Sequence, residues 1–140
     1  EEGIVAGGGV SFLAASSVLD SVQTSDADEK IGVEIIRKAL EAPVRTIANN
    51  AGFEGSVVVE KIKALPVGQG LDSASGQYGD MIEMGVLDPV KVTRTTLQNA
   101  ASVASLILIT EATVSEMPKD TTIEESISRA AAQGGQGGMY

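Results

Sequence analysis

The stretch Ala6-Gly7-Gly8-Gly9-Val10 decides the fold at the start of this chain, and Met84-Gly85-Val86-Leu87-Asp88-Pro89-Val90 decides it far downstream. Three consecutive glycines let the backbone turn sharply and approach other groups closely. The apolar residues directly after them recur at steps of three and four, which predicts one face of a helix: Val10, Leu13, Ala14 and Val18. A tight turn at the amino-terminal end of a helix is therefore predicted.

In the second stretch, Asp88-Pro89 has the residues of a helix start. Aspartate can accept backbone N–H groups as an N-cap, and proline fits the first helical position without sacrificing a donor. After this helix, Ala112 to Met117 is predicted as a short edge strand. Small and apolar residues form one face of the helix itself, which predicts burial in close helix contacts: Leu97, Ala100, Ala101, Ala104, Ile107 and Leu108.

Helical patterns also fill the middle of the chain. After a polar, acidic loop, Asp26 and Glu29 have the spacing of a capping pair. A long pattern from Ile31 to Ala51 follows, and Pro43 inside it predicts a kink or two abutting helices, because an interior proline costs about 3 kcal/mol. Another helix is predicted over Ser56 to Leu65.

Glycines interrupt the segment from Val67 to Gly79, where the apolar periodicity disappears. Leu71 to Ser75 and Gln77 to Gly79 are predicted to pair as a hairpin around the Ser75-Gly76 turn. We interpret this segment as a functional loop. The glycine-rich end, Gly134 to Tyr140, is predicted to be disordered.

Composition narrows the class of protein. The chain of 140 residues fits one domain, and 43% apolar with only 3% aromatic residues favours close-packed helices. The formal net charge of -9 repels phosphate backbones and anionic lipid headgroups, so nucleic acid and membranes are not expected partners. Cysteine and histidine are absent, which excludes disulfides, thiol nucleophiles and imidazole chemistry.

By themselves, the residues leave two interpretations of each candidate site open. The triple glycine suits a tight turn for packing, which is favoured, or a nucleotide site at a helix amino terminus. Asp88 suits a helix cap, which is favoured, or a ligand acceptor, and a carboxylate has enough acceptor positions for both. Val86 alone would be an ordinary core residue. No Gly-Lys-Ser/Thr follows the glycines, so they do not form a P-loop.

The order and spacing of the motifs resemble the carboxy-terminal part of the equatorial domain of group I chaperonins, the GroEL family. The resemblance covers almost the whole chain and is carried by these segments: Glu1-Glu2-Gly3-Ile4-Val5-Ala6-Gly7-Gly8-Gly9, Glu41-Ala42-Pro43, Tyr78-Gly79-Asp80-Met81-Ile82, Leu87-Asp88-Pro89, and Ala100-Ala101-Ser102-Val103-Ala104 into Thr110-Glu111. It implies a mainly α, multihelical bundle like a chaperonin equatorial domain, with a small β-hairpin and a short C-terminal edge strand. Residues 1–118 would form half of that domain, and 119–140 a disordered Gly-rich tail.

The resemblance also implies a nucleotide site. Gly8 would lie against the nucleotide, with Gly7 and Gly9 permitting the close approach. Asp88 would accept hydrogen bonds from the ribose hydroxyls, and Val86 would pack near the base. The segment that would meet the adenine edge is Asp72, Ser73 and Ala74. Many bacterial members have Asn-Ala-Ala there; an aspartate can accept a hydrogen bond from the adenine amino group but cannot donate one.

ATP or ADP is the cofactor that the resemblance implies, with Mg²⁺ held by ligands outside this chain. Family members carry their catalytic aspartate and phosphate loop upstream, so we expect a fragment with no catalytic residue of its own. The parent is expected to form a homo-oligomeric ring, a heptamer in single or double form, that encloses unfolded polypeptides with a co-chaperonin through domains missing here. The expected location is the bacterial cytoplasm, with the mitochondrial matrix or plastid stroma as alternatives.

A second hypothesis comes from a different class of protein. The isolated chain would then be a non-catalytic helical assembly module without nucleotide binding, in which the glycine run and Asp88 serve packing and capping. A self-sufficient nucleotide hydrolase ranks below both hypotheses, because the residues supply no phosphate-binding and catalytic set.

Overall fold

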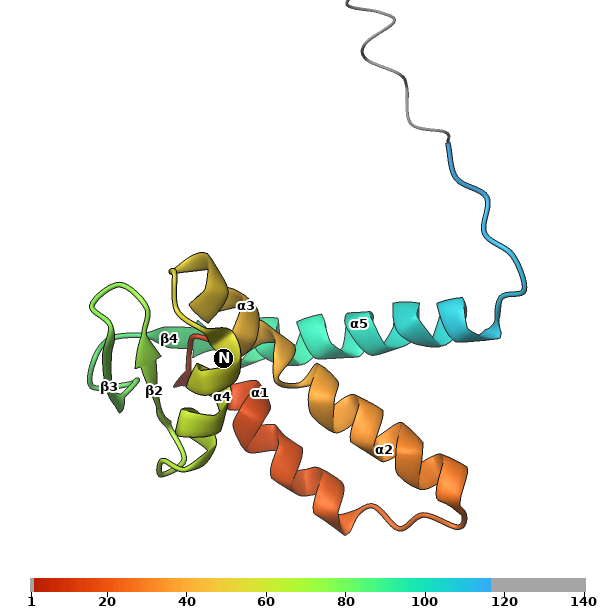
Figure 1. Cartoon of the computed structure of the whole chain (residues 1–140), viewed down its shortest axis with the longest axis horizontal. Helices are drawn as coiled ribbons and strands as arrows, with labels where there is room; N and C mark the ends of the chain where they lie inside the picture. The colour runs from red at the N-terminus through yellow and green to blue at the C-terminus, as the bar shows by residue number, and fades with distance from the viewer. Residues whose placement is uncertain (1, 117–140) are drawn as a thin grey trace, which may run out of the picture. The chain divides into compact units, whose positions relative to one another are not determined.

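The computed structural model describes residues 2–116 of the chain (Figure 1). Helices dominate, and the strands are short and form two separate pairs, which confirms the predicted mainly α fold. In chain order the elements are β1 (Ile4–Ala6), α1 (Val10–Ala15), the 3₁₀ helix η1 (Ser16–Ser21), α2 (Ala27–Ala39), α3 (Ala42–Asn50), α4 (Gly55–Lys63), β2 (Gln69–Asp72), β3 (Gln77–Asp80), β4 (Leu87–Pro89) and α5 (Val90–Ile109).

The glycine run ends at a helix start, as predicted. Gly9 is the N-cap of α1 and adopts a left-handed conformation with φ of 84°, which glycine tolerates without strain. Val10 and Leu13 on the next turn are buried. Beyond Ala15 the chain tightens into η1, where Val18 of the predicted face is 65% exposed, so the buried part of that face ends with α1.

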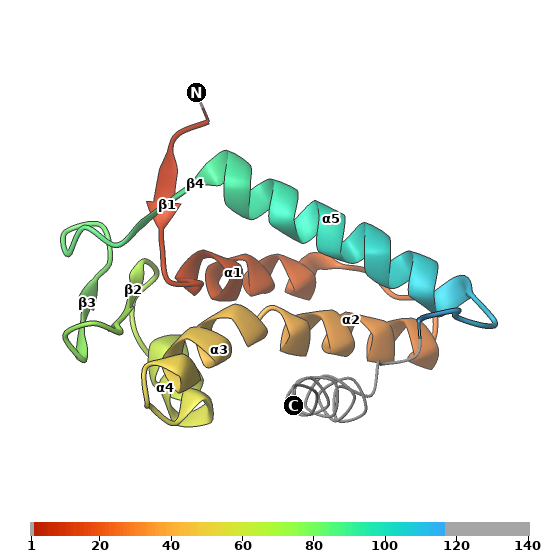
Figure 2. The ribbon, with the colours of Figure 1, turned by 90° about the horizontal axis from the view of Figure 1, so that it is seen from above.

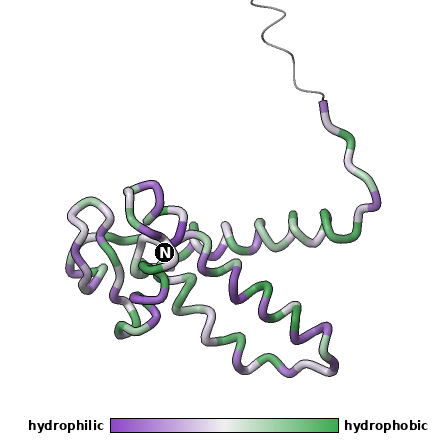
Figure 3. The backbone as a smooth tube through the Cα atoms, in the orientation of Figure 1, coloured by the Kyte–Doolittle hydropathy of each residue, from purple (hydrophilic) through white to green (hydrophobic). Residues whose placement is uncertain are grey.

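The predicted capping pair closes the loop before α2. Oδ1 of Asp26 accepts the N–H of Glu29 at 2.9 Å, and the Glu29 carboxylate accepts the N–H of Ser25 at 2.6 Å. The first bond satisfies a donor that the first turn of a helix leaves free, and the second ties the residue before the N-cap to that turn. Hydrophilic and hydrophobic segments alternate along the helix that follows, as Figure 3 shows.

Pro43 separates two helices, which confirms one of the two predicted outcomes. α2 ends at Ala39 and α3 begins at Ala42, so Pro43 lies in the first turn of α3, where its missing N–H costs no hydrogen bond. The two helices follow each other closely, and α2 runs beside α1 and η1 (Figure 2).

α3 and α4 are the most closely packed helices of the described chain. Gly55, the first residue of α4, permits the contact, since a β-carbon there would lie 2.6 Å from the carbonyl oxygen of Arg45. The N–H of Gly55 donates to Oδ1 of Asn49 at 2.8 Å, which ties the start of α4 to α3. The predicted helix over Ser56 to Leu65 is confirmed, with ends at Gly55 and Lys63.

The predicted hairpin is also confirmed. β2 and β3 pair antiparallel, with Leu71 opposite Tyr78 and Asp72 opposite Gln77. Gly76 in the connecting turn has φ of 73°, a conformation in which glycine is favoured. The second strand pair joins segments that are far apart in sequence, because β1 pairs antiparallel with β4.

The core gathers residues from β1, α1, α3, α4 and the β2–β3 region. Apart from Met81, which is fully buried, it consists of Ala, Val, Ile and Leu side chains, as the composition indicated. Its members are Ala6, Val10, Leu13, Val44, Ala48, Val58, Val59, Ile62, Leu71 and Met81.

Two expectations about α5 are wrong. The helix begins at Val90 and not at Pro89, because strand pairing continues through Pro89 and the carbonyl of Gly3 takes the N–H of Val90 at 3.1 Å. Its small and apolar face is not buried within the described chain: Leu97 is 40% exposed and Ile107 61%. The pattern is apolar enough for burial, but no described element covers it.

The short C-terminal edge strand is not present in the described residues. Residues 112–116 have irregular backbone, and Val114 is fully exposed. An extended segment becomes a strand only when a neighbour takes up its backbone hydrogen bonds, and no strand of residues 2–116 pairs with it. Met117 and the predicted disordered tail at 119–140 lie outside the described residues.

The chain divides into two units after Ala104, inside α5. The first unit contains both strand pairs, the core and all the candidate site residues. The described part of the second unit consists of the end of α5 and the exposed residues 110–116. Between residues 2 and 116, no helix has both the length and the apolar character needed to traverse a bilayer.

Candidate functional site

The two stretches that decide the sequence interpretation meet in one ribbon. β1 and β4 pair so that Val5 lies opposite Asp88 and Ala6 opposite Leu87. The ladder extends by one further bond, from the N–H of Gly7 to the carbonyl oxygen of Val86 at 2.9 Å. The glycine run therefore lies directly beside Val86 and within two residue pairs of Asp88.

Asp88 is half-buried, and its carboxylate has no hydrogen-bond or ion-pair partner within residues 2–116. The predicted capping role is wrong, since the backbone of Asp88 belongs to β4 and its side chain makes no bond to the first turn of α5. Every acceptor position of this carboxylate is thus available to a ligand or to water.

Gly8 lies against the apolar side chains of Met81 and Val86. Its φ is 66°, and a β-carbon there would lie 3.1 Å from Cε of Met81 and 3.8 Å from Cγ1 of Val86. Val86 is half-buried and packs against the core. Gly8, Val86 and Asp88 are thereby brought into one neighbourhood, with apolar groups beside a free carboxylate.

The other two glycines have clear packing roles. A β-carbon on Gly7 would lie 3.0 Å from the backbone of Leu87, and one on Gly9 would lie 2.8 Å from the backbone nitrogen of Val44. Gly7 therefore fits the ribbon, and Gly9 fits the start of α3. The packing interpretation of the triple glycine holds for these two positions and, against Met81, for Gly8 as well. Of the three, Gly8 is the one that the resemblance places against a nucleotide.

The segment Asp72, Ser73 and Ala74 forms the turn of the β2–β3 hairpin, which no described hydrogen bond joins to the glycine run or to Asp88. The Asp72 carboxylate is occupied by its own turn: Oδ1 accepts the N–H of Ala74 at 3.0 Å, and Oδ2 accepts the Ser75 hydroxyl at 2.5 Å. The Ser75 bond, and next the Ala74 bond, lower the pKa of Asp72 below its ordinary value of 3.8. Contact with an adenine would fall chiefly to the backbone of Ser73 and Ala74.

We predict that Asp72→Ala loosens this turn and that Asp72→Asn does so less, because an amide oxygen can still accept from Ala74. Amide hydrogen exchange of Ala74 measures the effect and should be faster in Asp72→Ala. Folding lowers the pKa of Asp72. Its stabilisation of the turn is therefore complete above pH 3.8, the ordinary pKa, and is lost as the pH falls through the lower pKa of the folded state. Equal exchange rates in wild type and Asp72→Ala would contradict the prediction.

Sequence reasoning assigned no role to Met81. Its N–H donates to the carbonyl of Gly68 at 3.1 Å, and its carbonyl accepts the N–H of Val86 at 2.8 Å. The only sign in the sequence is its place in the segment Tyr78 to Ile82; nothing in the spacing of apolar residues distinguishes it. Asp80 holds the turn around it by accepting the N–H groups of Ile82 and Glu83.

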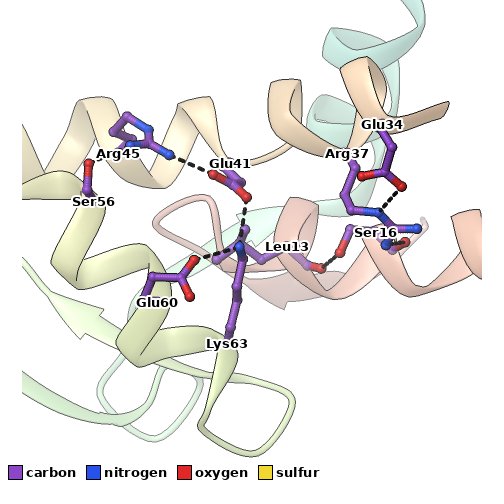
Figure 4. Close-up of polar contacts among 9 residues, drawn as sticks. All are labelled: Leu13, Ser16, Glu34, Arg37, Glu41, Arg45, Ser56, Glu60 and Lys63. Atoms are coloured by element: carbon purple, nitrogen blue, oxygen red, sulfur yellow. Dashed lines mark hydrogen bonds and ion pairs between the residues drawn. The ribbon is translucent and has the colours of Figure 1, made fainter. Parts of the chain in front are cut away.

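An ion-pair network joins the start of α3 to α4 (Figure 4). The Glu41 carboxylate, only 13% exposed, accepts from Arg45 at 2.6 Å and from Lys63 at 2.8 Å. Lys63 also contacts Glu60, and Arg45 donates to the Ser56 hydroxyl at 2.6 Å. The spacing of Glu41 and Arg45, four residues apart, is that of an ordinary helix-surface pair. Lys63 joins the pair from α4, which spacing within one helix cannot reveal.

A surface hollow borders β1 but does not include the candidate site. It is lined by Ile4, Val5, Val10, Ser11 and Ile82, among others, and includes neither Gly8 nor Asp88. In the part of the chain that the structure describes, no cluster of three or more Asp, Glu, His or Cys side chains is placed to hold a metal ion.

Comparison with known proteins shows the fold and the family of this chain. The chain is similar to a solved structure, the open-state monomer of a group II chaperonin from Methanococcoides burtonii, with a TM-score of 0.67 and 23% identity. The match covers 76% of this chain and 28% of that monomer, so the chain corresponds to a minor part of its length. Residues 1–118 match the family described as the TCP-1/cpn60 chaperonin family. This chain belongs to the TCP-1/cpn60 chaperonin family.

Proposed function

We propose that this chain supplies the adenine and ribose side of an ATP or ADP site in an ATP-dependent chaperonin subunit that assists the folding of non-native polypeptides. The observation that carries the proposal is the half-buried carboxylate of Asp88, which no described residue neutralises, beside Gly8 and Val86. Ribose hydroxyls are neutral donors that suit such an acceptor, and the half-buried Val86 offers an apolar surface against which a base can pack.

The residues present fit one end of a nucleotide only. α1 has six residues, so its amino terminus offers little to a phosphate group. The triphosphate, Mg²⁺ and the attacking water would be held by parts of the subunit outside residues 2–116. When bound, the nucleotide supplies the free energy of hydrolysis, and this chain binds and orients its sugar and base.

We extend the proposal to the parent protein as follows. The subunit forms a homo-oligomeric ring, a heptamer in single or double form, and acts on unfolded polypeptides with a co-chaperonin. Its assignment to group I rests on the sequence motifs around Gly3 and Asp88, because the solved structure reported above is of group II. The bacterial cytoplasm is the proposed location, with the mitochondrial matrix and the plastid stroma as alternatives.

We predict that Asp88→Ala in the complete subunit weakens ADP binding about tenfold or more, since hydrogen bonds to a charged acceptor contribute about 1.5–3 kcal/mol. The ADP affinity of Asp88→Asn should lie between those of the wild type and Asp88→Ala, because the amide keeps one acceptor oxygen. Isothermal titration calorimetry on the folded variants measures both affinities.

The matched control is Asp28→Ala, which removes an exposed carboxylate in the first turn of α2. Loss of any negative charge from an acidic subunit favours an anionic ligand, so this control isolates the effect of charge alone. Wild-type affinity in a folded Asp88→Ala subunit would remove the ribose role. Absence of binding by the wild-type subunit would favour the assembly module instead.

A further inference from the structure

Three backbone hydrogen bonds connect the segments that carry the proposed nucleotide site. The carbonyl of Gly68, just before β2, accepts the N–H of Met81 at 3.1 Å; the carbonyl of Met81 accepts the N–H of Val86 at 2.8 Å; and the carbonyl of Val86 accepts the N–H of Gly7 at 2.9 Å. Met81 is the central residue of this series. A shift of its backbone would therefore move Val86 and the glycine run together.

The Met81 side chain lies against two of these segments, the glycine run and β2. It has an exposed fraction of 0%. Its Cε would lie 3.1 Å from a β-carbon on Gly8, and its Sδ 2.9 Å from one on Gly70 in β2. This thioether thus occupies the space beside two glycines on different segments, together with the Val10 side chain at Gly70. The separation of the two segments therefore depends on the Met81 side chain.

We infer that Met81 is a positioning residue of the nucleotide site: its side chain packs against Gly8 and fixes the position of the glycine run relative to Val86 and Asp88. This inference rests on the proposed function. An unbranched thioether suits the role, because it fills an irregular gap between two backbones that a branched side chain would not follow. Displacement of Gly8 and Val86 would change the contacts available to a bound nucleotide, so support of this kind has a measurable consequence for affinity.

A purely structural role would give a different result. Val59 in α4 is as deeply buried, with an exposed fraction of 1%, and belongs to the same core cluster. None of the contacts described above joins it to Gly7, Gly8 or Asp88. Truncation of either residue leaves a cavity and lowers stability, but only truncation of Met81 removes the support beneath Gly8.

The experiment compares Met81→Ala, Met81→Leu and Val59→Ala in the complete subunit. ADP affinity is measured by calorimetric titration at a temperature where each variant is folded, and the melting temperature is measured separately. Met81→Ala should bind ADP about tenfold more weakly than Val59→Ala at a similar melting temperature. Met81→Leu, of nearly equal volume, should bind within about threefold of wild type. If Met81→Ala does not fold, Met81→Val replaces it, because valine also lacks the atoms that reach Gly8.

Equal ADP affinities for the Met81 and Val59 variants would overturn the inference, even if both lose stability. The proposed function fails in a different way: the wild-type subunit does not bind ADP, or Asp88→Ala binds as wild type does. Weak binding by Asp88→Ala together with unchanged binding by Met81→Ala leaves the proposed function standing and removes the positioning role alone.

Discussion

Gly9→Ala is expected to lower the free energy of unfolding by about 3 kcal/mol. Two costs add. An alanine at φ of 84° carries the strain of a left-handed residue, about 1–2 kcal/mol, and its β-carbon would lie 2.8 Å from the backbone nitrogen of Val44, where overpacking costs about 1–3 kcal/mol. The neighbour is the first turn of α3 and not the end of a flexible side chain, so it cannot move aside cheaply. Chemical denaturation followed by circular dichroism measures the change.

Gly52→Ala is the matched control for this prediction. Gly52 has φ of 85°, but a β-carbon there meets nothing within 4 Å. The control therefore carries the backbone strain without the overlap, and we expect it to cost about 1 kcal/mol. Equal losses in the two variants would show that conformation alone accounts for Gly9 and that its contact with α3 is unimportant.

Glu41→Ala is expected to cost about 2 kcal/mol of unfolding free energy. Glu41 lies between α2 and α3, and its carboxylate accepts two charge-assisted hydrogen bonds, one from Arg45 and one from Lys63 in α4. Each such bond contributes about 1.5–3 kcal/mol, but both cations are about two-fifths exposed and regain water when the carboxylate is removed. Glu60→Ala serves as the control, because Glu60 contacts the same Lys63 at 2.8 Å but is 73% exposed; it should cost about 0.3 kcal/mol.

The contribution of Glu41 depends on pH in a defined direction. The hydrogen bond from Lys63, and after it the one from Arg45, holds the pKa of Glu41 below its ordinary value of 4.5. As the pH falls, Glu41 is therefore protonated first in the unfolded chain. Its stabilisation of the fold is complete above pH 4.5, the ordinary pKa, and is lost as the pH falls through the lower pKa of the folded state. The stability difference between wild type and Glu41→Ala should be constant near neutral pH and shrink below pH 4.5. A difference that persists at lower pH would show that packing, not charge, makes Glu41 important.

Elements with strong local signals could be predicted from the sequence. The Asp26 and Glu29 cap, the break at Pro43 and the turn at Gly76 each depend on residues within a few positions of one another. The partnership of Gly8 with the Asp88 region was also predicted, although only the chaperonin resemblance and not spacing could suggest it. The structure places them in one ribbon, while nucleotide binding there stays a prediction.

The remaining features depend on contacts that sequence spacing does not encode. Asp88 matches the pattern of a helix cap, yet its pairing with Val5 commits it to a strand. Met81 shares its turn with the apolar residues Ile82 and Met84, and its burial follows from two backbones that converge on it. α5 has the composition of a buried helix but is exposed in this chain. In each case the deciding neighbour is distant in sequence.

The ribbon of β1 and β4 has a consequence for the order of events during synthesis. Ile4 leaves the ribosome long before Pro89, its strand partner, has been translated. The α3–α4 hairpin closes a short loop and can form early, whereas pairing of the ribbon must overcome the entropy of a loop that spans most of the first unit. In a nascent chain β1 therefore stays unpaired until β4 emerges, and the proposed nucleotide site is completed late in synthesis.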